Sequence, residues 1–241
     1  IPLGVGLVIP PWNFPFAIMA GMTCASLVSG NTVLLKPSSD SPMMAWLLME
    51  ILEEAGLPAG IVNFIPGPGA SVGDYLVAHP KIRYISFTGS MEVGLRINEV
   101  AAKKADGQIW IKRVIAEMGG KDSMIIDEGV DVDEAVKGTL AAAFGFQGQK
   151  CSACSRVIVH ANIYDRFVEK LIEEGKKLPI GNPDDNVYMG PVINEKSMKS
   201  ILSYIETGKK EKNKVVVGGA RAEGNGWFVQ PTIIVNVKPN D

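Results

Sequence analysis

Residues 32–65 read TVLLKPSSDSPMMAWLLMEILEEAGLPAGIVNFI, two short apolar runs with a longer amphipathic segment between them. The runs Thr32–Leu35 and Val62–Ile65 have the length and apolar content of buried strands. Between them, apolar residues recur at helical spacing over residues 42–55, and Ser41 is placed to cap that helix. Strand, helix and strand in this order predict a parallel α/β sheet.

The same alternation continues on both sides of this stretch. Further segments are predicted as strands at Val5–Ile9, Tyr84–Phe87 and Val114–Ala116, and as a helix at Met91–Lys104. The strands are nearly continuous apolar runs, which is typical of a parallel sheet covered by helices on both faces. The first half of the chain therefore has the pattern of an open α/β sheet.

The pattern starts again after Gly119 and Gly120. Strands are predicted at Met124–Ile126, Val157–His160, Val215–Val217 and Thr232–Val235, and helices at Asp133–Phe146, Tyr164–Lys177 and Lys196–Lys210. We place a domain boundary near residues 118–121, which divides the chain into domains 1–118 and 119–241.

The overall composition excludes several classes of protein. The chain has 241 residues, of which 46% are hydrophobic and 21% charged, as in an ordinary globular protein. Its 24 Lys and Arg residues nearly balance 26 Asp and Glu residues, so no basic field is available to bind nucleic acid. No apolar run reaches about 18 residues, so no membrane span is predicted. Because the chain starts at Ile1 inside a strand-like run, we expect it to be a piece of a longer protein.

The cysteine and histidine counts limit the redox and metal chemistry. Three cysteines, Cys24, Cys151 and Cys154, are too few and odd in number for a disulfide scaffold. We therefore expect a reducing compartment, the cytoplasm, or the mitochondrial matrix if the source is eukaryotic. The two histidines, His79 and His160, lie far apart without the spacing of ligands, so no metal site is predicted.

Cys151 is the first candidate for chemistry, in the sequence GFQGQKCS at residues 145–152. The neighbouring Lys150 supplies a cation that favours the thiolate, which is the nucleophilic form of a cysteine. The alternative is a buried small hydrophobic residue. Cys154 completes a Cys-x-x-Cys pair, but the pair lacks the strand-to-helix turn of a thioredoxin-like site and the second pair of a zinc ribbon.

Glu117 and Asn13 follow predicted strands and are further candidates. Glu117 would lie in a cleft between the two halves, where partial burial would suit it to act as a general base. The alternative is a strand-end glutamate paired with Lys121 or an arginine. Asn13 stands in the proline-rich loop PPWNFP, which would hold its amide in place for an oxyanion hole. A turn-forming asparagine explains it equally well.

Small residues and a lysine follow the other predicted strands. The segments are Lys36-Pro37-Ser38-Ser39, Gly67-Pro68-Gly69 and Phe87-Thr88-Gly89-Ser90. The carboxyl ends of parallel strands form the usual ligand crevice of an open α/β sheet, and amides at a helix start near Ser90 would suit a pyrophosphate. Tight turns explain each segment equally well when it is taken alone.

The order of these segments is more specific than any one of them. PWNFP, KPS, FTGS, EMGGK and GQKC occur at positions 11–15, 36–38, 87–90, 117–121 and 148–151. The series resembles the aldehyde dehydrogenase family over essentially all 241 residues, although members of that family are considerably longer. Residues 145–153 and 188–193 look most like the branch that oxidises L-glutamate γ-semialdehyde to glutamate in proline and arginine breakdown.

The resemblance implies a fold and a set of reacting groups. Residues 1–118 would form a Rossmann-like cofactor-binding domain and residues 119–241 a second α/β catalytic domain, both partial. Cys151 would attack the aldehyde, Asn13 would stabilise the oxyanion, and Glu117 would activate the water that hydrolyses the thioester. Lys150 and Ser152 would help to receive the substrate. The full-length enzyme would be a homo-oligomer.

The resemblance also implies an NAD site at the strand ends. The residues expected to contact the cofactor are Ile9, Pro11, Trp12, Lys36, Ser39, Gly69, Phe87, Gly89, Ser90 and Gly119. Many relatives that use NAD carry a glutamate at the position of Ser39, where it would repel the 2′-phosphate of NADP. We therefore expect NAD as the cofactor, with NADP tolerated.

The chain lacks the family's Glu-x-Phe-Gly-Pro segment, whose glutamate binds the nicotinamide ribose. We therefore expect little or no turnover from this polypeptide alone. Two other functions stay open on the sequence: an aldehyde dehydrogenase of another substrate class, and a non-catalytic nucleotide-binding or assembly module.

Overall fold

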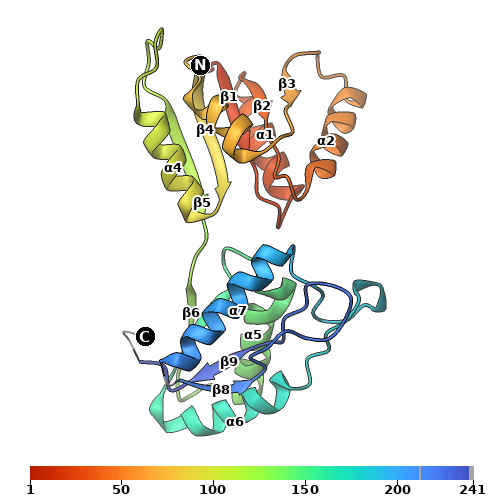
Figure 1. Ribbon diagram of the computed structural model, residues 1–241, viewed down its shortest axis with the longest axis vertical. Helices are drawn as coiled ribbons and strands as arrows, with labels where there is room; N and C mark the ends of the chain where they lie inside the picture. The colour runs from red at the N-terminus through yellow and green to blue at the C-terminus, as the bar shows by residue number, and fades with distance from the viewer. Residues whose placement is uncertain (212, 239–241) are drawn as a thin grey trace. The chain divides into compact units, whose positions relative to one another are not determined.

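The computed structural model describes residues 1–211 and 213–238. The chain divides into two compact units, Ile1–Gly119 and a second that starts at Gly120. Each unit has its own sheets and its own hydrophobic core (Figure 1). The fold class is α/β with a parallel sheet, as predicted.

Unit 1 is built on a five-stranded sheet in the order β3-β2-β1-β4-β5. Its strands are β1 (Val5–Ile9), β2 (Thr32–Leu35), β3 (Val62–Phe64), β4 (Ile82–Gly89) and β5 (Arg113–Met118). All neighbouring strands run parallel, with Leu7 of β1 opposite Leu34 of β2 on one side and Ile85 of β4 on the other. A parallel sheet collects the carboxyl ends of its strands at one edge.

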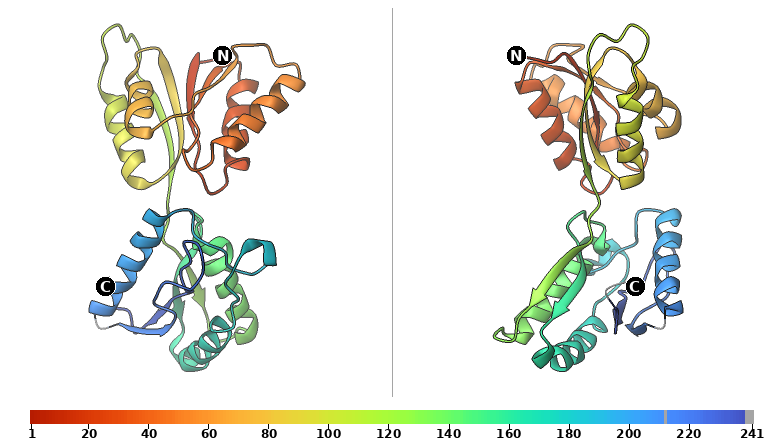
Figure 2. Two further views of the ribbon diagram at one scale, coloured as in Figure 1. Left: turned by 45° about the vertical axis from the view of Figure 1, so that its right-hand side comes forward. Right: turned by 90° about the vertical axis from the view of Figure 1, so that its left-hand side faces the viewer.

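Helices cover both faces of this sheet. They are α1 (Ala17–Val28), α2 (Pro42–Glu54), α3 (Asp74–Ala78) and α4 (Met91–Ala102), with a short π-helix at Gly69–Gly73. Neighbouring residues of β1 point to opposite faces, so Val8 packs with Met19 of α1 and Leu48 of α2, while Leu7 packs with the α3 and α4 side. The turned views show α4 across the sheet from α1 and α2 (Figure 2).

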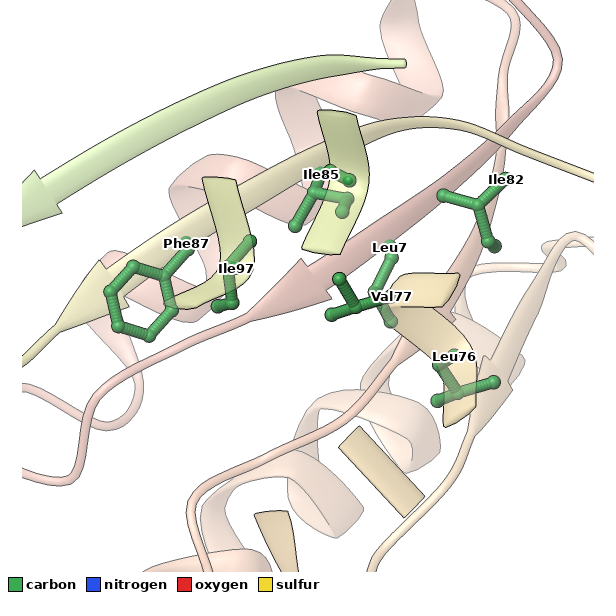
Figure 3. Close-up of a cluster of buried hydrophobic side chains, with 8 residues drawn as sticks. Leu7, Leu76, Val77, Ile82, Ile85, Phe87 and Ile97 are labelled. Atoms are coloured by element: carbon green, nitrogen blue, oxygen red, sulfur yellow. The ribbon is translucent and has the colours of Figure 1, made fainter. Parts of the chain in front are cut away.

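Buried apolar side chains form the core between the sheet and helices α3 and α4. Leu7 and Ile85 are fully buried there, and they meet Val77 of α3 and Ile97 of α4 (Figure 3). Burying such side chains contributes about 1.5–3 kcal/mol each. This core fixes the spacing of β1, β4 and β5 from the helix that follows β4.

Unit 2 contains a pair of parallel strands and a separate antiparallel pair. The parallel strands are β6 (Asp122–Ile126) and β7 (Cys154–Val159), and the antiparallel strands are β8 (Lys214–Val217) and β9 (Ile233–Val235). Its helices are α5 (Val132–Phe144), α6 (Tyr164–Gly175) and α7 (Glu195–Lys210), with 3₁₀ turns at Gly145–Gly148, Ala161–Ile163 and Pro183–Asp185. Val136 of α5 and Phe167 of α6 are the most deeply buried residues of its core.

The structure differs from the predicted elements in a few places. Helices α1 and α3 were not predicted, and α4, α5 and α6 each end two residues earlier than expected. Ser41 occupies the N-cap of α2, but its side chain makes no capping hydrogen bond. The predicted strands are all present, some of them longer than expected.

Candidate active site

The carboxyl edge of the unit 1 sheet gathers the residues that the sequence singled out. Pro11 and Trp12 follow β1, Lys36 and Ser39 follow β2, and Gly69 follows β3. In the sheet, β2 and β3 lie on one side of β1, and β4 and β5 lie on the other side. The direction in which the chain adds strands to the sheet therefore reverses between β1 and β4. Ligands of open α/β sheets bind at this kind of switch point.

Lys36 is a buried cation at this edge. Its side chain is only 4% exposed, and its Nζ donates one hydrogen bond, to the carbonyl oxygen of Pro37 at 2.9 Å. Burial lowers the pKa of Lys36 below its ordinary value of 10.5. An ammonium has three donors, so within residues 1–119, all of which the structure describes, two N–H groups of Lys36 lack an acceptor. Hydroxyl groups of a cofactor ribose are acceptors of the required kind.

Gly69 and Gly119 leave open space at the same edge. A Cβ built on either glycine would meet no heavy atom within 4 Å, so the protein itself does not fill the volume beside them. Gly73 instead touches the stem of Lys36, whose Cε lies 3.6 Å from the position of a Cβ there. Gly69 is exposed, so a group bound beside it would meet no side chain of this residue.

Ser90 begins the helix that follows β4. Its Oγ accepts a hydrogen bond from the amide of Val93, which makes it the N-cap of α4. The amides of Met91 and Glu92 have no acceptor within residues 1–119. The first amides of an α-helix carry partial positive charge and bind anions such as a pyrophosphate. The predicted contact with Ser90 thus has a physical basis in the helix that it caps.

Phe87 and Gly89 serve packing. Phe87 is 4% exposed and belongs to the core of unit 1, and its contact with a cofactor stays a prediction. The ring lies against β4 and α4, where a Cβ on Gly89 would approach it to 2.6 Å and a Cβ on Gly94 to 3.2 Å. These two glycines permit the close strand–helix contact that brings the start of α4 to the sheet edge.

The remaining predicted cofactor contacts differ in exposure. Pro11 is buried, Ile9 and Trp12 are half-buried, and Ser39 is exposed. The Oγ of Ser39 reaches the carbonyl oxygen of Gly67 at 3.5 Å, which joins the loops after β2 and β3. These residues line the same edge as Lys36.

Asn13 and Glu117 both belong to unit 1. Asn13 is half-buried in the loop between β1 and α1, and its neighbours Pro11 and Pro15 restrict that loop. Glu117 is the penultimate residue of β5, opposite Thr88 of β4. Within unit 1 this residue is exposed, and it forms no ion pair with any residue that the structure describes; its burial in a cleft between the two halves stays a prediction.

Cys151 lies in unit 2, in the loop between α5 and β7, and its side chain is partly exposed. The amide of Gly120 donates to the carbonyl oxygen of Cys151 at 3.2 Å. A Cβ on Gly120 would approach that oxygen to 2.7 Å, so only glycine allows this contact. Gly120 of the EMGGK segment thus has a local role that sequence reasoning missed: it holds the backbone of the cysteine.

The loop before Cys151 has an unusual backbone. Phe146 and Gln147 adopt left-handed conformations, with φ of 57° and 55°, and Gly148 follows at 67°. Such a conformation costs about 1–2 kcal/mol for each residue other than glycine. Strain of this kind persists only where the surrounding structure enforces it, and it gathers at functional sites.

A second segment of unit 2 holds this loop in place. The Oε1 of Gln149 accepts a hydrogen bond from the amide of Ile193 at 2.9 Å. Gly190 lies against Gln147, whose Nε2 is 3.5 Å from the position of a Cβ on that glycine. Segments 145–153 and 188–193, which together suggested one branch of the family, are therefore in direct contact. The role of Gln149 was not predicted, although it stands inside the GQKC motif.

The other predicted residues of unit 2 lie beside Cys151. Lys150 is half-buried, Ser152 is exposed, and Cys154 is buried at the start of β7. The Sγ of Cys154 points to the carbonyl oxygen of Arg156 at 3.3 Å. All three cysteines are free thiols.

Two features are absent from residues 1–211 and 213–238, the part of the chain that the structure describes. No group of three or more His, Cys, Asp or Glu side chains is placed there to hold a metal ion. No helix in these ranges is both long and apolar enough to cross a membrane.

The structure thus brings the predicted cofactor contacts together within unit 1 and the predicted substrate contacts together within unit 2. Asn13 and Glu117 stand in one unit and Cys151 in the other. That the amide, the carboxylate and the thiol meet at one reaction centre stays a prediction.

Comparison with known proteins gives matches over the whole chain. Residues 1–241 match the model of the aldehyde dehydrogenase family. The 1-pyrroline-5-carboxylate dehydrogenase of Bacillus cytotoxicus is 58% identical over 238 residues, which cover 98% of this chain and 46% of that protein. The chain therefore spans about half the length of the curated relatives it matches.

Solved structures give the same result. The 1-pyrroline-5-carboxylate dehydrogenase from Thermus with bound NAD is 48% identical, with a TM-score of 0.96 over 99% of this chain and 46% of that one. The aldehyde dehydrogenase of Bacillus cereus in complex with NAD⁺ is 38% identical, with a TM-score of 0.92 over 98% of this chain and 47% of that one.

Proposed function

This chain belongs to the aldehyde dehydrogenase family, and on that premise we propose that it takes part in the NAD-dependent oxidation of an aldehyde to a carboxylate. The observation that carries the proposal is the backbone around Cys151. A glycine amide and two strained left-handed residues hold a partly exposed thiol that has no disulfide partner. Such preorganisation is typical of a nucleophile.

The proposed substrate is L-glutamate γ-semialdehyde. Relatives up to 58% identical bear the name 1-pyrroline-5-carboxylate dehydrogenase. Addition of water to the ring imine of 1-pyrroline-5-carboxylate opens the ring and gives this amino-acid aldehyde, so both names describe one substrate pool. Lys150 and Ser152, on either side of Cys151, are the residues of unit 2 proposed to receive it.

The chemistry follows from three side chains. The thiolate of Cys151 would add to the aldehyde carbon and form a hemithioacetal, with the oxyanion held by the Nδ2 of Asn13 and the backbone amide of Cys151. When bound, the nicotinamide accepts the hydride that this carbon loses. The resulting thioester needs water, and Glu117 would remove a proton from that water as it attacks. The products are a carboxylate and the restored thiol, so water supplies the second oxygen.

We propose that unit 1 holds the cofactor and unit 2 supplies the nucleophile. Lys36 would donate its two remaining N–H groups to ribose hydroxyls, and the free amides at the start of α4 would bind the pyrophosphate. The open space beside Gly69 would take the adenine. NAD bound to the Thermus and Bacillus cereus relatives supports this cofactor. Because Ser39 carries no charge, NADP would also be accepted.

Two further proposals concern the surroundings of the enzyme. Three free thiols support a reducing compartment, the cytoplasm.

The strand β5 pairs only with β4 among residues 1–119 and exposes 63% of Ile115, which supports association with another copy of the chain.

The proposal is tested on the protein expressed from its complete reading frame. Cys151→Ala should abolish NADH formation, whereas Cys24→Ala, a matched change at an exposed thiol on α1, should retain it. Asn13→Ala should lower kcat by about 10²–10³-fold, the usual loss for one oxyanion donor.

Glu117→Gln gives a sharper result, because Glu117 is assigned to the second half of the reaction. This variant should release one equivalent of NADH per active site in a rapid burst and then turn over slowly. Turnover that survives Cys151→Ala would contradict the proposal. Cofactor binding by the wild type without oxidation of any aldehyde would favour a nucleotide-binding module instead.

A further inference from the structure

The loop that leads to Cys151 contains two glutamines, one on each side of Gly148, and their side chains meet. The Oε1 of Gln149 accepts a hydrogen bond from the backbone amide of Ile193 at 2.9 Å. Its Nε2 donates to the Oε1 of Gln147 over a longer distance, 3.4 Å. One side chain thus connects the loop of the thiol with a segment 44 residues further along the chain.

Gln149 acts on the part of the loop whose backbone is strained. Phe146 and Gln147 both have positive φ, and Gln147 is the residue that the Nε2 of Gln149 reaches. The backbone amide of Gln149 also donates to the carbonyl oxygen of Phe146 at 3.0 Å. Left-handed residues other than glycine persist only where their surroundings hold them. Two hydrogen bonds of Gln149 supply part of that restraint.

The cysteine lies between two restraints. On one side, Gln149 stands two positions before Cys151 and is held by Ile193. On the other side, the amide of Gly120 donates to the carbonyl oxygen of Cys151 at 3.2 Å. Removal of the acceptor on Gln149 would leave the backbone of the cysteine held by Gly120 without the tie to Ile193.

The position of this backbone matters because the proposed reaction uses the amide of Cys151 as an oxyanion donor. Such a donor stabilises the transition state only when it already points to the place where the charge develops. A displacement of about 1 Å in a group of this kind can cost about 10²-fold in rate. A looser loop should therefore slow the addition of the thiolate to the aldehyde and leave the binding of substrate and cofactor little changed.

We infer that Gln149 is a positioning residue of the reaction, which holds the backbone of Cys151 in place through its hydrogen bond with Ile193. The inference rests on the proposed function and gives a role to a residue that neither the sequence motifs nor the resemblance assigned. The group required is the acceptor oxygen. Gln149→Glu keeps an oxygen at the same distance along the side chain, whereas Gln149→Met keeps only the length.

The test measures kcat and KM on the protein expressed from its complete reading frame, with L-glutamate γ-semialdehyde and NAD. Gln149→Met should lower kcat by about 10- to 100-fold, with KM for both substrates unchanged. Gln149→Glu should recover most of the lost kcat. Each kcat is taken from the plateau of its pH profile, so that the charge of the new glutamate does not enter the comparison.

Gln230→Met is the matched control. Gln230 is a half-buried glutamine of unit 2 whose side chain makes no hydrogen bond among the residues that the structure describes, so this variant should keep the wild-type kcat. Alkylation of Cys151 with iodoacetamide, followed by peptide mapping, counts the competent thiols in each preparation. Dividing kcat by this count removes the contribution of unfolded protein.

Hydrogen–deuterium exchange gives a readout that does not depend on activity. Exchange of the amides in residues 144–153 should be faster in Gln149→Met than in the wild type and should return towards the wild-type rate in Gln149→Glu. A wild-type kcat in Gln149→Met, an equal loss in both variants, or a rise in KM with kcat unchanged would overturn the inference. A wild type that oxidises no aldehyde would instead overturn the proposed function, and the exchange comparison would then decide whether Gln149 holds the loop.

Discussion

At the scale of single residues, Lys36 shows how burial and function are linked. A charged amine that is 4% exposed with one acceptor is costly to fold. The cost is understandable if a bound molecule supplies the missing acceptors. The sequence pointed to Lys36 because a lysine follows a strand, but its stem lies against Gly73 of the Gly69–Gly73 π-helix, a contact that only the fold reveals.

Phe87 and Ser90 belong to one motif but have different surroundings in the fold. The FTGS motif correctly marked the end of β4 and the start of α4. It could not tell which side chains of the motif face the crevice, because a strand alternates its faces and the register is set by neighbouring strands. The structure turns Phe87 into the core and leaves Ser90 at the helix start.

Lys36 also predicts a pH dependence of stability. Its pKa is lowered in the folded protein, so between that lowered value and 10.5 the unfolded chain binds more protons than the folded chain. The free energy of unfolding should therefore rise with pH across this window. Lys36→Met removes this contribution, so the stability of the wild type relative to the variant should increase from neutral pH towards pH 10.5. Urea titrations at several pH values measure it.

Lys104→Met, a matched change at an exposed lysine, reports the effect of the substitution itself. If the free energy of unfolding of the wild type, relative to that of Lys36→Met, falls as the pH rises, burial does not destabilise the charged form of Lys36.

The cofactor preference is a second prediction at this scale. Ser39→Glu places a carboxylate at the exposed position after β2, where it would repel a 2′-phosphate. We expect kcat/KM with NADP to fall by about tenfold or more, since 1.4 kcal/mol of repulsion suffices for that factor. The value with NAD should change little. Ser39→Gln introduces a side chain of the same shape as glutamate but without its charge, so this variant should still use NADP. If Ser39→Gln also loses activity with NADP, the size of the side chain and not its charge causes the loss.

At the scale of elements, the strands were easier to predict than the helices. Each strand of unit 1 contains a short apolar run bounded by glycines, prolines or polar residues. Such a run identifies a strand whichever other strands it pairs with. Helix α1 was missed for a physical reason. Its buried positions include Thr23 and Ser26, while Val28 is exposed, and no side chain caps its start. The apolar residues of α1 therefore do not recur at helical spacing, and no N-cap residue marks its start.

The connection between α1 and β2 gives a prediction about stability. The Oδ1 of Asn31 accepts hydrogen bonds from the amides of Leu3 and Gly4, and its Nδ2 donates to the carbonyl oxygen of Ser26. This residue therefore anchors the segment that leads into β1. Asn31→Ala should lower the free energy of unfolding by about 1–3 kcal/mol, because buried polar groups lose their partners.

Denaturation followed by tryptophan fluorescence measures this loss. Asn98→Ala, at an exposed position of α4, should stay within about 0.5 kcal/mol of the wild type. An equal effect of both substitutions would contradict the anchoring role of Asn31.

At the scale of the whole molecule, the chain divides into two compact units, each with a core of its own. The sequence signalled a change near Gly119 and Gly120, where the strand–helix pattern starts again. The assignment of cofactor binding to one unit and the nucleophile to the other stays a prediction. It depends on contacts between segments distant in the sequence, which motif order alone does not determine.

Unit 1 should fold when it is expressed alone as residues 1–119. It contains a five-stranded sheet with cores on both faces, which is sufficient for a cooperative fold. Circular dichroism and dispersed amide resonances would demonstrate this. An unfolded product would show that unit 1 depends on unit 2.

The isolated unit 1 should also self-associate through β5, whose outer edge and Ile115 are exposed. Ile115→Lys should reduce the associated fraction in analytical ultracentrifugation. The change adds charge at a position that is 63% exposed, so the circular dichroism spectrum of the folded unit should stay the same. Association that persists in this variant would place the contact elsewhere.

The hydrogen bond from Gly120 to Cys151 has a consequence for how such enzymes diverge. It fixes the cysteine proposed as the nucleophile through main-chain atoms, whereas the groups proposed to receive the substrate, on Lys150 and Ser152, are side chains. Gene duplication followed by substitution at those two positions would therefore change substrate preference without disturbing the nucleophile. Reactivity and selectivity can then be inherited separately, which lets paralogues acquire new aldehydes in a few mutational steps.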